Sequence, residues 1–274
     1  MKLFGKTIIA ALMAAVCVSV FGSCFAGKDA REASGSIKET RRVEYFSKVE
    51  IASAVDVKFV QGKSCSMRVE GPQRLVDNLV VKQSGDRLTL TYKPGLRFNF
   101  SSGSLTVYLT SPDLTEVSIA GSGEFLARGV VDTDNLSVRV SGSGEVSLPR
   151  VVCDNAYFDL RGSGDVRAQS VECRSASVSL AGSGDVTLRS LKADKADIAV
   201  RGSGDVDAWL KSVASTRISV VGSGDVDVNF DNCGKADCTV AGSGDVELSG
   251  TLGQLSRSAS GSGEIDTAKL MLKQ

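Results

Sequence analysis

The chain has 274 residues with 32 basic and 32 acidic side chains, a balance that gives no support to a nucleic-acid partner. Histidine is absent, which excludes Ser-His-Asp and Cys-His catalysis and removes the commonest transition-metal ligand. Aromatic residues make up only 5%, which disfavours stacking platforms for sugars or bases, while carboxylate catalysis and calcium binding through oxygen ligands stay open.

Residues 1–23 have the features of an export signal. Two lysines precede an apolar run over residues 7–21, which is short for a membrane span and typical of a cleaved signal peptide. Residues 21–24, Phe-Gly-Ser-Cys, resemble a bacterial lipobox, although phenylalanine stands where leucine is usual. We therefore expect Cys24 to carry a lipid that anchors the protein to a membrane; cleavage after Ala26 is the alternative.

Residues 24–40 are charged, small and aperiodic, and predict a flexible tether. Residues 41–118 have the alternation of strands without a repeated motif, and we expect irregular β rungs that cap a larger repeat array. A short helical turn is expected from Leu75 to Val80. Strands are expected over residues 55–62, 66–72, 87–92 and 104–109.

Residues 119–274 carry a strict internal repeat. Gly-Ser-Gly-Asp or Gly-Ser-Gly-Glu recurs at an almost constant spacing along this part of the chain. The repeats begin at Gly121, Gly142, Gly162, Gly182, Gly202, Gly222, Gly242 and Gly261. A period of this kind is typical of one structural unit stacked on itself.

Each repeat is expected to be a set of short strands. Over residues 162–181 apolar and polar side chains alternate with period two, and the same columns recur in the next repeat. One such rung cannot bury its apolar face alone, whereas stacked rungs bury a continuous core. The sequence therefore predicts an all-β, single-stranded parallel β-helix with rungs of about 20 residues and an atypical N-terminal cap. Residues 268–273 are expected to close its far end.

The repeated glycines are expected to form the corners of the rungs, because glycine tolerates positive φ. A phosphate-cradling loop needs a helix N-terminus behind the glycines, and here a strand follows.

The cysteines of the repeats fall in two columns. Cys153, Cys173 and Cys233 each occupy the same position relative to the glycine that opens their repeat, so Cys153 and Cys173 should stack in adjacent rungs. Cys238 shares an interior column with Phe158. We expect small buried thiols, with a bridge between Cys153 and Cys173 as the alternative in an exported protein.

Several segments resemble a known family when they are taken in order. These are Phe46-Ser47-Lys48-Val49, Val55-Asp56-Val57, Leu88-Thr89-Leu90, Val107-Tyr108-Leu109-Thr110 and the serial repeats after Leu114. Over about residues 41–270 the chain resembles the head GIN domain family, described as putative auto-transporter adhesins. The resemblance implies a β-helical fold and a cell-envelope location, and it brings no catalytic residues.

Acidic residues form a grid in the last rungs. The Asp after each turn and the residue two positions later should face outward together in three rungs. The grid consists of Asp205, Asp207, Asp225, Asp227, Asp245 and Glu247. Opposed like charges destabilise a sheet, so turn hydrogen bonds, solvent or a cation should compensate them. A solvated acidic face is the first expectation; a weak calcium site is the alternative, and no other cofactor or metal is expected.

Trp209 should lie beside this grid on the outer face. Arg189 occupies the same column one rung earlier, so a cation–π pair between the two is expected. An exposed aromatic platform for a ligand is the alternative.

Together these features predict a non-enzymatic, adhesin-like protein of the cell envelope, held by its lipid on the surface or periplasmic side of the outer membrane. Its partners would be the membrane, through the lipid, and a surface glycan or protein ligand. A periplasmic structural or signalling component without an external ligand is the first alternative. A carbohydrate-active β-helix enzyme with a carboxylate pair is the second. The sequence does not indicate an oligomeric state.

Overall fold

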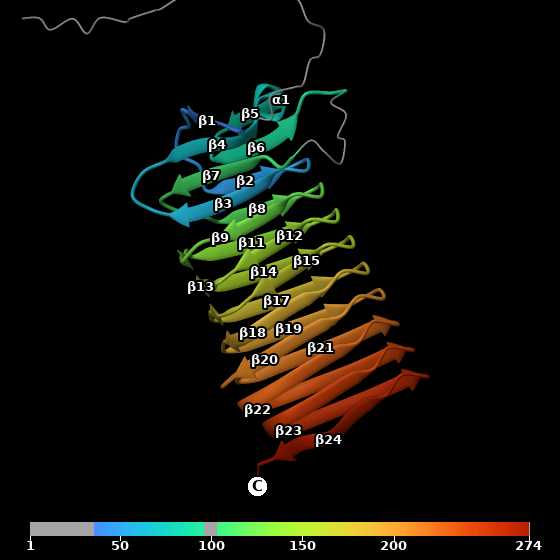
Figure 1. Cartoon of the computed structure of the whole chain (residues 1–274). Coiled ribbons are helices and arrows are strands. Elements are labelled where there is room, and N and C mark those ends of the chain that lie inside the picture. Colours follow the sequence, from blue (N-terminus) through green and yellow to red (C-terminus); the bar gives the residue numbers. More distant parts are fainter. Residues whose placement is uncertain (1–35, 96–102, 274) are drawn as a thin grey trace, which may run out of the picture. The chain divides into compact units, whose positions relative to one another are not determined.

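A computed structural model describes residues 36–95 and 103–273 of the chain, which form a β-solenoid (Figure 1). The predicted export signal, Cys24 and the first part of the predicted tether lie outside the described residues. In these two ranges no helix is long and apolar enough to cross a membrane. The all-β fold and the rungs of about 20 residues are confirmed.

The first part of the described chain forms an irregular cap. Strand β2 pairs in parallel with both β6 and β8, and β3 pairs in parallel with both β7 and β9. Three antiparallel pairs, β1–β4, β4–β7 and β5–β6, end the parallel stacking on this side. The elements of this part are β1 (Ser36–Arg41), β2 (Lys48–Ile51), β3 (Asp56–Gln61), β4 (Ser66–Pro72), α1 (Gln73–Asn78), β5 (Leu79–Ser84), β6 (Arg87–Tyr92) and β7 (Thr106–Ser111).

Two expectations for this part need correction. The sequence predicts a tether that extends to residue 40. In the structure, however, Ser36–Arg41 is strand β1, which pairs along its whole length with β4. The helical turn expected from Leu75 to Val80 is α1, Gln73–Asn78; it buries Leu75 and Val76 and ends where β5 begins.

The regular rungs begin at β8, and their strands stack in parallel. In the earlier rungs the strands are β8 (Glu116–Ile119), β9 (Glu124–Ala127), β10 (Val130–Asp132), β11 (Asn135–Val140), β12 (Glu145–Leu148), β13 (Arg150–Val152), β14 (Asn155–Leu160), β15 (Asp165–Ala168), β16 (Val171–Glu172) and β17 (Ser175–Leu180). In the later rungs they are β18 (Val186–Lys192), β19 (Lys195–Val200), β20 (Val206–Lys211), β21 (Ser215–Gly222), β22 (Val226–Gly242), β23 (Val246–Gly261) and β24 (Ile265–Leu272).

One sheet of the solenoid matters for the site. It runs through β1, β4, β7, β3, β9, β12, β15, β18, β20, β22, β23 and β24, each strand paired with the next. We call it the flank sheet. From β12 onward, equivalent residues of neighbouring rungs lie side by side in it, as Val166, Val186, Val206 and Val226 do. The repeat period therefore becomes columns of like side chains on its surface.

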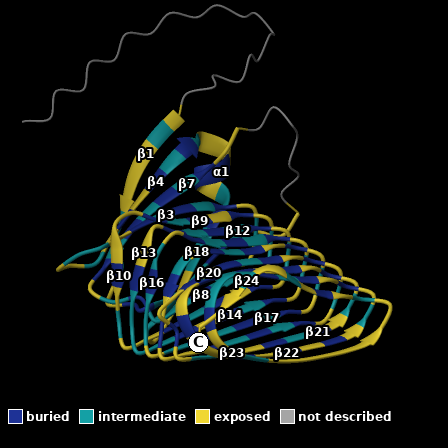
Figure 2. Ribbon diagram, turned by 90° about the horizontal axis from the view of Figure 1, so that it is seen from below, coloured by how far each residue is buried: buried dark blue, intermediate teal, exposed yellow. Residues whose placement is uncertain are grey.

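The core is a stack of apolar columns inside the rungs (Figure 2). One column contains Phe158, Val178, Ile198, Ile218 and Cys238, all at most 2% exposed. The predicted interior place of Cys238 is thus confirmed. Strand alternation turns every second side chain inward, so each rung supplies its share to one continuous core.

The repeated glycines lie in the turns, as predicted, but the reason why glycine is needed there differs from the expected one. Among the glycines that open the repeats, φ is positive only at Gly222, Gly242 and Gly261. The common cause is close stacking. A Cβ on Gly184 would lie within 3.0 Å of the carbonyl oxygen, carbonyl carbon and nitrogen of Gly164, which is backbone that has no room to move aside. Explaining the turn glycines by positive φ alone was therefore wrong for most of them.

The C-terminal end is closed in part by a polar side chain. Arg257 occupies the column of Cys238 in the last rung, where no further rung covers it. Its guanidinium donates hydrogen bonds to the carbonyl oxygen of Ile265 at 3.1 Å and to Oγ1 of Thr267 at 3.0 Å. Strand β24 pairs with the first half of β23 and ends the array.

Candidate functional site

The acidic residues of the repeats lie in two outward columns on the flank sheet. The valine between them, such as Val226 between Asp225 and Asp227, points into the core and is fully buried. Alternation along the strand therefore turns both acids to solvent. The first column follows the turns and the second lies two positions further along each strand.

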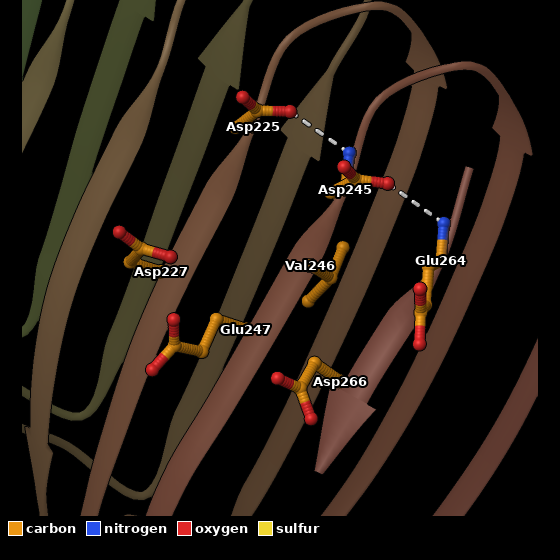
Figure 3. Close-up of a pocket in the computed structure, with 7 residues that line it drawn as sticks. All are labelled: Asp225, Asp227, Asp245, Val246, Glu247, Glu264 and Asp266. Atoms are coloured by element: carbon orange, nitrogen blue, oxygen red, sulfur yellow. Dashed lines mark hydrogen bonds between the residues drawn. The ribbon is translucent and has the colours of Figure 1, made fainter. Parts of the chain in front are cut away.

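The first column is a hydrogen-bonded ladder from rung to rung (Figure 3). Oδ1 of Asp225 accepts a hydrogen bond from the backbone N–H of Asp245 at 2.9 Å, and Oδ1 of Asp245 accepts one from Glu264 at 2.8 Å. Asp205 does the same for Asp225 at 3.0 Å. Two earlier steps, from Asp165 through Asp185 to Asp205, measure 3.3 and 3.4 Å. Each carboxylate thus satisfies the N–H group that opens the next strand, which offsets the repulsion along the column.

The second column lacks such a ladder. It contains Asp207, Asp227 and Glu247, and it continues to Asp266. Sequence reasoning missed Asp266, although it stands two positions after Glu264 just as Glu247 stands two positions after Asp245. Burial, followed by the charges of Asp207 and Glu247, raises the pKa of Asp227 above its ordinary value. Repulsion between like charges is therefore greatest in the middle of this column.

Two cations flank the acidic columns without entering their middle. Nζ of Lys269 lies 2.7 Å from a carboxylate oxygen of Glu247. At the other end Arg167 pairs with Asp165 at 2.7 Å and also with Glu145. No ion pair reaches Asp227 within the described residues, which is consistent with the direction of its pKa.

Two hollows follow the acidic columns. One, of about 330 Å³, is lined by Asp225, Asp227, Asp245, Val246, Glu247, Glu264 and Asp266 (Figure 3). The other, of about 250 Å³, lies toward Arg167 and shares Asp225 and Asp227 with the first. Across residues 36–95 and 103–273, no group of three or more Asp, Glu or Cys side chains is placed to hold one metal ion. Calcium takes six to eight oxygens, so the calcium alternative stays a prediction for experiment.

Trp209 lies next to the acidic columns, on the same sheet. Its side chain is 36% exposed, and Cζ of Arg189 lies 4.6 Å from the centre of its ring. The predicted cation–π pair is therefore present. In the next rung Asn229, the register partner of Trp209, donates a hydrogen bond to Oγ of Ser249 at 3.0 Å.

The cysteine columns have the arrangement that the spacing predicts. Cys153 and Cys173 lie in adjacent rungs, half-buried and unbridged, and their thiols are hydrogen-bonded. The hydrogen bond from Cys173 lowers the pKa of the Cys153 thiol, and the pKa of Cys173 is raised because it keeps the shared proton. Cys233 and Cys238 are buried thiols of the core.

The other end of the flank sheet carries cations that sequence reasoning did not single out. Arg68 of β4, Tyr108 of β7 and Lys58 of β3 lie side by side in register, and Arg128 follows strand β9. They line a groove of about 390 Å³. We call it the cationic groove. The flank sheet thus carries this cationic groove near its N-terminal end and the paired acidic columns toward its C-terminal end.

These features define a class: a β-solenoid with a capped N-terminal end and one long sheet of ordered, charged side chains. A family model described as "Putative auto-transporter adhesin, head GIN domain" matches residues 45–229 and 210–274. The chain belongs to this family. No curated protein matches it.

Solved structures with the same fold come from Parabacteroides and Bacteroides. A "putative lipid binding protein" from Parabacteroides distasonis is 23% identical, with a TM-score of 0.75 over 85% of this chain and 96% of its own. A "putative adhesin" from Parabacteroides merdae is 17% identical, with a TM-score of 0.73 over 85% and 97%. Another "putative adhesin", from Bacteroides fragilis, is 22% identical, with a TM-score of 0.60 over 85% and 97%. At these identities the likeness shows the fold alone.

Proposed function

We propose that this protein is a lipid-anchored, adhesin-like component of the cell envelope that binds a surface ligand with the flank sheet of its solenoid. The observation that carries the proposal is the flank sheet itself. It presents ordered rows of charged side chains to solvent, such as the ladder from Asp205 to Glu264. A long outward surface of this kind suits binding to an extended partner. Membership of a family described as adhesins supports the same role.

The proposal assigns no catalytic residue. A carboxylate pair that hydrolyses a glycosidic bond needs two unlike environments, so that one group holds a proton while the other stays ionised. Asp205, Asp225 and Asp245 instead share one environment, since each accepts a hydrogen bond from the next rung. The hollows beside them are lined mainly by like acids.

The lipid anchor rests on Cys24 and the motif before it. A single acyl chain binds membranes only weakly, so a stable anchor at this cysteine needs more than one chain. The variant Cys24→Ala should lose incorporation of a labelled fatty acid, whereas Cys17→Ala in the same signal should keep it. Labelling that persists in Cys24→Ala would count against this anchor.

The binding role is tested by adhesion. A strain that lacks the protein should attach less to a glycan- or matrix-coated surface than its parent, and the wild-type gene should restore attachment. A complemented strain whose protein carries neutral residues in the cationic groove separates a role of the flank sheet from a general envelope effect. Attachment that is equal with and without the protein would favour a periplasmic structural or signalling role.

A further inference from the structure

The cationic groove is built where the antiparallel cap meets the first parallel rungs. Cζ of Arg68 lies 4.3 Å from the centre of the Tyr108 ring, and Nζ of Lys58 lies 5.8 Å from it. The backbone N–H of Arg128 donates to the carbonyl oxygen of Phe59 at 2.7 Å, which fixes the Arg128 backbone beside β3. Two cations thus flank one ring, and a third lines the same groove.

The side chains that line the groove carry more positive than negative charge, and the acids Asp56 and Glu124 lie outside this lining, on the same face of β3 and β9. Among the described residues no acid lines it, and within residues 36–95 and 103–273 neither Lys58 nor Arg128 forms an ion pair. Arg68 pairs with Glu70 at 3.2 Å, but Glu70 also binds Lys38 at 3.1 Å. The hydrogen bond from Lys38, with further contributions from Tyr108 and Arg68, holds the pKa of Glu70 below its ordinary value. The carboxylate of Glu70 is therefore shared between Arg68 and Lys38, and the charges of Lys58 and Arg128 in the groove stay without an ion-pair partner among the described residues.

The remaining lining indicates what kind of anion fits. Three hydroxyl side chains, those of Thr40, Ser66 and Thr110, lie around the cations. Val60, which is 42% exposed, is the only large apolar side chain of the described lining that is exposed. Insertion into a membrane surface needs a broad apolar face, and this lining lacks one. Hydroxyl groups and cations together match a ligand that carries both hydroxyls and acidic groups.

We propose that the cationic groove binds the anionic groups of an acidic carbohydrate. Lys58 and Arg128 contact the carboxylate or sulfate groups, and the hydroxyl side chains contact the sugar hydroxyls. Recognition by charge needs no free aromatic face, which agrees with the few aromatic residues of the chain. This inference rests on the proposed function, since it names the ligand class of the flank sheet.

The acidic columns limit where such a ligand lies. Lys58 and Asp207 share one outward row of the flank sheet, five strand steps apart through β9, β12, β15, β18 and β20, or about 24 Å. That distance is about three Debye lengths at physiological salt, so Asp207 itself is screened from the groove. Nearer acids border the groove on one side: Asp56 lies two positions before Lys58 on β3, and Glu124 lies beside Asp56 on β9. An acidic chain that extends toward Asp207 and Asp227 meets repulsion at close range. The ligand is therefore confined to the N-terminal end of the sheet.

The test is binding of the purified protein to defined glycans. Polygalacturonate supplies carboxylates, chondroitin sulfate supplies sulfates as well, and dextran is the neutral control. Both acidic polymers should bind, dextran should not, and affinity should fall as salt rises. The double variant Lys58→Ala with Arg128→Ala should bind about tenfold more weakly, since charge-assisted hydrogen bonds are the strong ones. Lys58→Arg with Arg128→Lys should retain most of the affinity.

A matched control removes two exposed cations at the other end of the solenoid, Lys211→Ala with Lys235→Ala. It should bind as the wild type does. Equal loss in both double variants would overturn the site, because binding would then follow net charge alone. Unchanged affinity in Lys58→Ala with Arg128→Ala, with a normal melting temperature, would overturn it as well. So would binding to vesicles that contain phosphatidylglycerol in the absence of binding to either acidic glycan.

The adhesion experiment separates this inference from the proposed function. If the protein promotes attachment of cells but binds no acidic glycan, the ligand class is wrong and the adhesin-like role stands. If it binds acidic glycans through Lys58 and Arg128 but its removal leaves attachment unchanged, the site stands and the adhesin-like role fails.

Discussion

The replacement of one turn glycine by alanine tests how the rungs are held together. Gly184 has no positive φ, so alanine brings no backbone strain there. Its Cβ would instead lie within 3.0 Å of three backbone atoms of Gly164. Relief requires neighbouring turns to separate, which disturbs the hydrogen bond from the N–H of Ser183 to the carbonyl oxygen of Gly162, 3.0 Å in length.

The expected cost is large for a single methyl group. Overpacking of a well-packed region costs about 1–3 kcal/mol, and the upper end applies because the contacted atoms are backbone. A loss of about 3 kcal/mol in the free energy of unfolding lowers the melting temperature of a domain of this size by roughly 6–12 °C. Thermal unfolding followed by circular dichroism measures this directly.

Two control variants distinguish the effect of steric contact with the neighbouring rung from the effect of backbone strain at positive φ. Ser183→Ala changes an exposed side chain in the same turn and should leave the melting temperature within about 1 °C of the wild type. Gly129 has a φ of 93°, and a Cβ there would meet nothing within 4 Å, so Gly129→Ala should cost only about 1 kcal/mol of strain. If Gly184→Ala is no more damaging than Ser183→Ala, close stacking is not the reason for the repeated glycines.

Three further predictions concern the acidic end of the flank sheet. Because burial and the neighbouring carboxylates raise the pKa of Asp227, its contribution to stability is present below the unfolded-state pKa and is lost as pH rises through the folded-state pKa. At pH 7, Asp227→Asn should therefore have a free energy of unfolding about 0.5 kcal/mol higher than the wild type, once solvent screening is allowed for, and should unfold at a higher urea concentration. This difference should vanish near pH 3. A variant less stable than the wild type at pH 7 would contradict the assignment. Arg189→Ala should cost about 0.5–1 kcal/mol and change the fluorescence of Trp209, whereas an unchanged spectrum would mean that the pair is absent in solution. Millimolar calcium should not shift the melting temperature, because no described group of acids converges on one ion; a clear upward shift would restore the calcium alternative.

Much of the solenoid follows from the sequence because the repeat fixes the register. With a strict period, Cys238 falls in the column of Phe158, and Arg189 falls beside Trp209. Alternation then decides which side chains face out, so the acids of the grid lie on one surface. These placements need only the period and the pleat of a strand.

The cap and the cationic groove lack this regularity. Strand β1 has a charged sequence, and only its pairing with β4 makes it a strand. The groove draws on strands that no repeat relates: Lys58, Arg68 and Tyr108 come together through both parallel and antiparallel pairs. Long-range pairing of unlike segments leaves no period in the sequence, which is why these cations were missed.

The reason why glycine is required in the turns also could not be predicted from the sequence. Glycine is favoured both by positive φ and by close approach of another backbone, and the residue type does not distinguish the two. At Gly184 the structure indicates the second cause, since the neighbouring rung fills the space that a Cβ needs. The distinction matters for engineering, because Asn or Asp can replace a glycine that is needed for its positive φ but not one that is needed for close approach of another backbone.

If the flank sheet meets ligands outside the cell, protease added to intact cells should reach the solenoid. A probe for this protein follows its loss from whole cells, with lysed cells and a periplasmic protein as controls. We expect digestion of this protein on intact cells while the periplasmic control survives. Protection on intact cells, with digestion only after lysis, would place the solenoid in the periplasm and contradict an adhesin-like role.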